Sequence, residues 1–85
     1  MPAVFKTAEG ASTIEITISD LSSVSDLVVR VVEIGRAQVD AEITASAIQL
    51  HFMPTPSAKP RKVTRSTLWA ELEQATALIV TPASS

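Results

Sequence analysis

The stretch TIEITIS, residues 13–19, constrains the fold most, because apolar and polar side chains alternate in it without a break. Three isoleucines alternate with threonine and glutamate, which is the period of a strand with one buried face. A shorter run, AVFKTA at residues 3–8, can pair with it across the Glu9-Gly10 turn. The sequence therefore predicts a sheet that starts with a hairpin and has one solvent-exposed face.

The core beneath such a sheet must be small and aliphatic. The chain has 85 residues, 46% of them hydrophobic, but its only aromatic side chains are two phenylalanines and one tryptophan. A chain of this length encloses a single core. It has no cysteine for a disulfide, and its one histidine makes a structural zinc site implausible. We therefore expect one small domain over residues 1–85, stabilised by packing, self-association or a partner.

The segment after the first strands, residues 22–35, fits both a helix and a strand. Its β-branched content favours a strand. Its apolar side chains recur every three or four residues, which favours a helix and would place Arg30 beside Asp26. Ser23 supplies an N-cap and Gly35 a C-terminal stop. We expect a helix that ends at Gly35.

A second alternation runs through residues 37–53 and slips by one residue at Ala47. The apolar side chains fall on odd positions up to Ala45 and on even positions from Ile48. One extra residue turns every later side chain to the other face, so we expect either one bulged strand or a hairpin. The bulge is preferred, because TASA lacks the residues of a tight turn.

Residues 54–65, PTPSAKPRKVTR, combine three prolines with four of the seven basic residues, so we expect an extended basic loop. After it, apolar side chains at helical spacing from Leu68 to Ile79 predict a second helix that begins near Ser66 or Thr67. The run ALIV at residues 77–80 allows a short final strand instead. Residues 82–85 are expected to form a flexible tail.

This order of elements predicts an α+β fold in which an antiparallel sheet of about three or four strands carries two helices on one face. If residues 37–53 form a hairpin and residues 77–80 a strand, the order becomes βαββαβ, the ferredoxin-like arrangement. Neither arrangement carries a function by itself.

Motifs for catalysis and for cofactor binding are missing from the sequence. His51 is the only histidine, and Asp40 and Glu42 lie about 30 Å from it along an extended strand. Two glycines do not make a phosphate-binding loop, and no serine lies in a nucleophile motif. We therefore expect no catalytic residue, no metal and no cofactor, and a protein that is not an enzyme.

The candidate partner-binding residues lie in the basic stretch and at the start of the last helix. They are Lys59, Arg61, Lys62, Arg65, Leu68 and Trp69. Tryptophan is enriched at protein interfaces, and sheet edges, here the long strand, are further routes of assembly. We expect a non-catalytic interaction module that self-associates or docks on a larger protein.

An accessory nucleic-acid-binding protein that uses residues 59–65 is the alternative, since basic side chains contact phosphates. The net charge of −2 argues against general binding of nucleic acid or anionic membranes. Every apolar run is shorter than the roughly 18 residues of a transmembrane helix, and the N-terminus has no secretory pattern. We expect a cytoplasmic protein without membrane contact.

Overall fold

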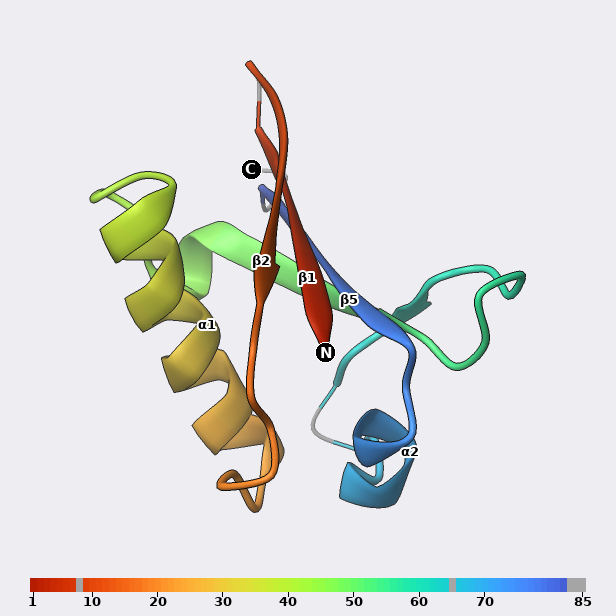
Figure 1. Cartoon of the computed structure of the whole chain (residues 1–85). Helices are drawn as coiled ribbons and strands as arrows, with labels where there is room; N and C mark the ends of the chain where they lie inside the picture. The colour runs from red at the N-terminus through yellow and green to blue at the C-terminus, as the bar shows by residue number, and fades with distance from the viewer. Residues whose placement is uncertain (8, 65, 83–85) are drawn as a thin grey trace.

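The computed structural model describes residues 1–7, 9–64 and 66–82 and contains a five-stranded mixed sheet with two α-helices (Figure 1). The small α+β fold is confirmed, but the sheet has more strands than expected and is not purely antiparallel. In chain order the elements are β1 (Pro2–Thr7), β2 (Gly10–Glu15), α1 (Val24–Gln38), the 3-10 helix η1 (Ala45–Ala47), β3 (Ile48–Met53), β4 (Arg61–Lys62), α2 (Trp69–Glu73) and β5 (Ala77–Pro82).

The strands lie in the order β2-β1-β5-β3-β4. All neighbours are antiparallel except β1 and β5, which run parallel in the centre of the sheet. The first and last strands of the chain thus meet in the middle, between two antiparallel pairs. The element order is ββαββαβ, which differs from the ferredoxin-like alternative by the additional first hairpin strand.

The core fills the space between α1 and the sheet face that this helix crosses (Figure 1). Alternate strand residues point toward the helix, which is why Phe5 and Val80 are buried while their strand neighbours are not. The short helix α2 adds Leu72 to the same buried cluster. Among the described residues, no polar or charged side chain is buried. The core is aliphatic apart from two phenylalanines, as the composition predicts.

The start of α1 follows the sequence prediction. Its N-cap is Ser23, whose side chain accepts a hydrogen bond of 3.2 Å from the backbone N–H of Asp26. The predicted pairing of Arg30 with Asp26 is wrong. Arg30 instead contacts Asp20 at 3.1 Å, and the Asp26 carboxylate accepts bonds from Ser22.

The predicted end of α1 at Gly35 is wrong, because the helix continues to Gln38. Gly35 is buried inside the helix. A Cβ atom there would lie 3.0 Å from both Ile43 Cδ1 and Phe5 Cε2. The glycine therefore serves close packing of β1 and of the following loop against the helix.

The long strand predicted over residues 37–53 forms only in its second half. The helix still covers its first two residues, and a loop with η1 precedes β3, which begins where the alternation slips. In the loop, Asp40 accepts a 2.9 Å bond from the N–H of Glu42, and Arg36 Nε donates to the carbonyl oxygen of Ile43 at 2.6 Å. These local bonds replace strand pairing, so neither the bulge nor the hairpin occurs in this part of the described chain.

The predicted first hairpin is confirmed, although β2 begins and ends earlier than residues 13–19. Its buried isoleucine face continues past the strand, where Ile16 is 0% exposed. Ile16 and Met1 exchange backbone hydrogen bonds of 2.8 and 2.9 Å. The pairing of the two segments therefore extends to the first residue of the chain.

The second helix begins at Trp69, slightly later than the predicted start near Ser66 or Thr67, and its predicted continuation to Ile79 is wrong because α2 ends at Glu73. Ile79 lies in β5, so the alternative of a final strand is correct. The expected tail, residues 82–85, begins with the last residue of β5, and residues 83–85 lie outside the described residues.

Candidate interaction surface

The sheet ends in two edge strands, β2 and β4, which differ in length and charge. Strand β4 has two residues, Arg61 and Lys62, both exposed. Strand β2 has six residues, of which Glu15 alone is charged. An edge strand presents backbone N–H and C=O groups that can pair with another chain, and basic side chains on an edge oppose such pairing. Strand β2 is therefore the edge suited to pairing.

The register of β2 with β1 shows which of its backbone groups face outward. Met1 and Ile16 exchange both backbone bonds, and bonded pairs alternate with non-bonded pairs along an antiparallel ladder. Every second residue from Ile16 back to Gly10 therefore bonds to β1. The residues between them direct their N–H and C=O groups to the open edge: Ala11, Thr13 and Glu15. These groups can form up to about six hydrogen bonds with an added strand.

The long strand that the sequence suggested as an edge lies elsewhere. Its folded part, β3, has β5 on one side and β4 on the other, so it is an internal strand. Sequence reasoning missed β2 as an edge strand because strand order is not a local property. The only local signal is composition, since GASTIE has a single charge and small side chains.

The sheet face that points away from the buried cluster carries one row of side chains across all five strands. The row consists of Thr13, Val4, Ile79, His51 and Lys62. His51, the one candidate acid or base, is partly buried in this row beside Lys62. Within the described ranges, no group of three histidine, cysteine or acidic residues could hold a metal ion.

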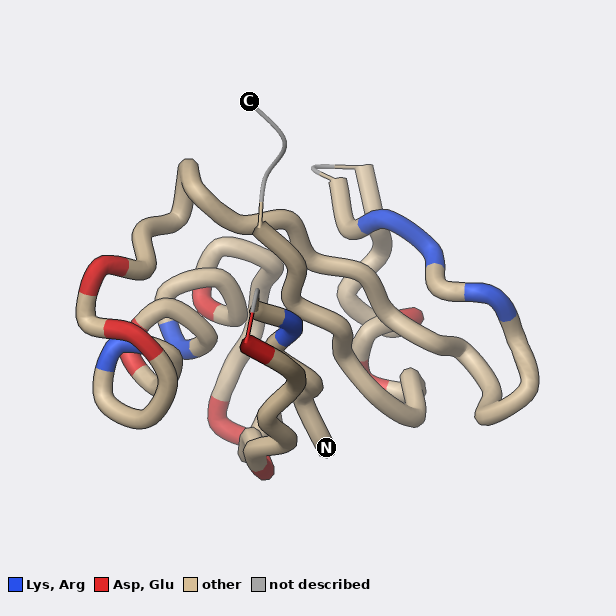
Figure 2. The backbone as a smooth tube through the Cα atoms, turned by 90° about the horizontal axis from the view of Figure 1, so that it is seen from above, with Lys and Arg blue, Asp and Glu red and all other residues tan. Residues whose placement is uncertain are grey.

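The basic stretch forms one border of the molecule. Lys59, Arg61 and Lys62 are exposed, and the last two pair with β3. Figure 2 shows these basic segments on the side away from the acidic loop that follows α1. The fourth predicted residue of this group, Arg65, lies outside the described residues.

The two apolar candidates at α2 differ in accessibility. Leu68 is 66% exposed, whereas Trp69 is partly buried and packs against the core. The indole Nε1 of Trp69 is enclosed and has no hydrogen-bond partner in the part of the chain that the structure describes. Leu68 is thus the accessible member of the pair.

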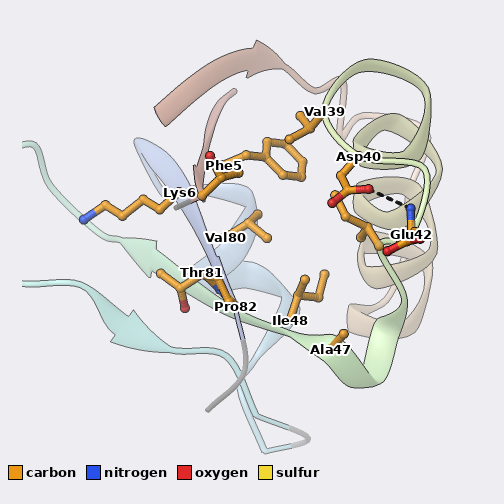
Figure 3. Close-up of a pocket in the computed structure, with 12 residues that line it drawn as sticks. Phe5, Lys6, Val39, Asp40, Glu42, Ala47, Ile48, Val80, Thr81 and Pro82 are labelled. Carbon is orange, nitrogen blue, oxygen red and sulfur yellow. Dashed lines mark hydrogen bonds between the residues drawn. The ribbon is translucent and has the colours of Figure 1, made fainter. Parts of the chain in front are cut away.

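A cleft of about 320 Å³ lies between the sheet and the loop after α1. Figure 3 shows Lys6 pointing away from it, while Asp40 is held at its rim by the bond from Glu42. The side chains that point into it are apolar: Phe5, Ile48 and Val80. No histidine, cysteine or serine is among the described residues that line it. The cleft is thus an apolar recess whose lining also includes the carboxylates of Asp40 and Glu42 and the hydroxyl groups of two threonines.

Comparisons with protein-family models, with curated proteins and with solved structures found no match. In residues 1–7, 9–64 and 66–82, no helix is long and apolar enough to cross a membrane.

Proposed function

We propose that this chain is a non-catalytic protein-interaction module that self-associates or docks on a larger protein through the β2 edge of its sheet. The outward backbone groups of Ala11, Thr13 and Glu15 carry the proposal. Strand addition to a sheet edge obtains affinity from main-chain hydrogen bonds and therefore needs no specialised side chains. The module acts in the cytoplasm, without a metal or cofactor.

The size of the core supports a role in association. A domain of this length buries only about 60 to 65% of the surface of its unfolded chain, so a partner adds appreciably to its stability. The chain contains no cysteine that could supply a disulfide instead. Pairing along β2 would extend the sheet and give the outward backbone N–H and C=O groups of that strand hydrogen-bond partners.

The substitution Thr13→Pro tests the edge directly. The Thr13 N–H faces the open edge, so proline removes an outward donor without removing a bond to β1. We expect Thr13→Pro to abolish association while the circular-dichroism spectrum stays that of the wild type. Light scattering on a size-exclusion column and co-precipitation with tagged protein measure the association.

Thr13→Ala is the matched control, because it keeps the N–H and should associate like the wild type. Ser12→Pro is the opposite control, since it removes a bond to β1 and should lower stability. Association of Thr13→Pro at wild-type strength would contradict the proposal. So would a wild-type chain that stays monomeric at high micromolar concentration and recovers no partner.

An accessory nucleic-acid-binding role is the second candidate, and the exposure of Lys59, Arg61 and Lys62 along one border favours it. Such binding should weaken steeply as salt rises. Fluorescence anisotropy with single-stranded RNA and duplex DNA at two salt concentrations tests it. The variant Arg61→Gln/Lys62→Gln should lose most of the binding. Absence of binding to either probe at low salt would exclude this role.

A further inference from the structure

We infer that the partner at the β2 edge is a second copy of this chain, joined by antiparallel pairing of the two β2 strands around a two-fold axis at Thr13. This inference rests on the proposed function and adds the partner and the register. In this pairing, Thr13 faces Thr13 of the second copy, and Ala11 faces Glu15 of the second copy. The two sheets become one continuous sheet.

The hydrogen-bonding pattern restricts the register. Outward groups belong to Ala11, Thr13 and Glu15, so residues with odd numbers must pair with one another. A shift in one direction would bring Glu9, which lies in the turn before the strand, opposite Glu15 of the second copy, and like charges in facing positions are destabilising. A shift in the other direction would pair Ala11 with Thr17, which lies beyond the strand. The register centred on Thr13 keeps the full overlap and places no like charges in facing positions.

This register also brings opposite charges together. Lys6 of β1 is the neighbour of Ala11 on the open face of the sheet. Glu15 of the second copy would lie on the other side of Ala11, with its Cα about 10 Å from that of Lys6. The methyl group of Ala11 leaves space above it, and both charged side chains are long enough to meet there.

The charged groups are accessible for this contact. Lys6 is exposed and points away from the cleft (Figure 3). The Glu15 side chain is 74% exposed, and its Oε1 accepts a 2.6 Å bond from the amino group of Met1. Its other carboxylate oxygen can face the second copy. Because the axis is two-fold, the contact between Lys6 and Glu15 occurs twice in the dimer.

The pairing also explains why assembly would stop at two copies. An isologous contact uses the same strand of both copies, so no second β2 edge remains after it forms. The outer strands of the joined sheet are then the two β4 strands. Each is short and carries Arg61 and Lys62, and these basic side chains oppose further edge pairing.

Charge reversal and mixing test the inference. In Lys6→Glu alone the contact joins two carboxylates, and in Glu15→Lys alone it joins two ammonium groups. We expect either variant to raise the dissociation constant of its own dimer about tenfold at low salt. An equimolar mixture of the two variants restores both attractive contacts, so mixed dimers should form at close to wild-type affinity. The double variant Lys6→Glu/Glu15→Lys should also dimerise like the wild type.

Sedimentation velocity gives the dissociation constants, and native mass spectrometry distinguishes mixed from homogeneous dimers. Circular dichroism checks that each variant is folded. A monomeric wild type, unchanged dimers in the single variants, or no preference for mixed dimers would overturn the inference. The wild type could instead stay monomeric and bind another protein, with that binding lost in Thr13→Pro but kept in Thr13→Ala. This result would leave the proposed function intact and would exclude only the second copy as the partner.

Discussion

At the scale of single residues, Gly35 is a position where helix propensity and packing disagree. Glycine inside a helix costs about 1 kcal/mol relative to alanine, so Gly35→Ala would ordinarily stabilise α1. Here the new methyl group would lie 3.0 Å from Phe5 and Ile43. Phe5 is enclosed in the core and has little room to move. We expect Gly35→Ala to lower the free energy of unfolding by about 1 kcal/mol in urea denaturation.

The control for this prediction removes one of the two contacts. Ile43→Val deletes Cδ1, the atom of Ile43 nearest to the new methyl group. The double variant Gly35→Ala/Ile43→Val should therefore lose less stability than the sum of the single losses. Strict additivity, or a more stable Gly35→Ala, would contradict the packing account.

The two leucines of the α2 region should respond in opposite ways. Leu72 is 1% exposed, so Leu72→Ala should lower the free energy of unfolding by about 3 kcal/mol. Leu68 is exposed, and Leu68→Ala should change stability by less than about 0.5 kcal/mol. Thermal or urea unfolding followed by circular dichroism measures both. Equal losses at the two positions would contradict the described placement of α2.

At the scale of elements, the start of α1 depends on its cap. Ser23→Ala removes the acceptor of the Asp26 N–H and should lower the free energy of unfolding by about 1 kcal/mol. Ser25→Ala is the matched control, because Ser25 is exposed in the first helical turn and should tolerate alanine. A similar loss in both variants in urea denaturation would show that the cap bond contributes little.

The elements that could be predicted from the sequence are those whose own residues show a regular spacing of apolar side chains. The first hairpin, the start of α1 and the second half of the 37–53 alternation are all visible in this way. Residues 39–45 also alternate, yet Ala41 and Ala45 are exposed and bury little surface. Local hydrogen bonds, such as that from the N–H of Glu42 to Asp40, form there in place of strand pairing. The helical spacing of apolar side chains near the C-terminus gave a wrong prediction, because these residues are divided between α2 and β5.

The candidate surface was less predictable than the fold. The basic residues Arg61 and Lys62 were identifiable by charge alone, and they lie on an edge strand. The β2 edge depends on the strand order of the whole sheet, which brings together residues from both ends of the chain. Sequence periods report which side of a strand is buried, but not which strand lies at an edge.

At the scale of the whole molecule, stability depends on β5. This strand lies between β1 and β3 and contributes the buried residues Leu78 and Val80. A chain that stops before Ala77 would lose the contact between the two halves of the sheet. We expect such a chain to unfold without a cooperative transition in calorimetry.

The control is a chain that stops after Pro82, the last described residue, which should unfold cooperatively like the full chain. A cooperative transition in the shorter chain would show that the two outer strand pairs do not need β5. Nuclear magnetic resonance spectra of both truncations would identify which amide groups stay protected.

The central position of β5 has a consequence for biosynthesis. Residues 77–82 leave the ribosome after all the other strands, so the nascent chain carries two hairpin-like halves with no strand between them. Until β5 emerges, the inner sides of β1 and β3 are exposed to other nascent chains and to chaperones. The sheet can therefore close only after β5 has left the ribosome.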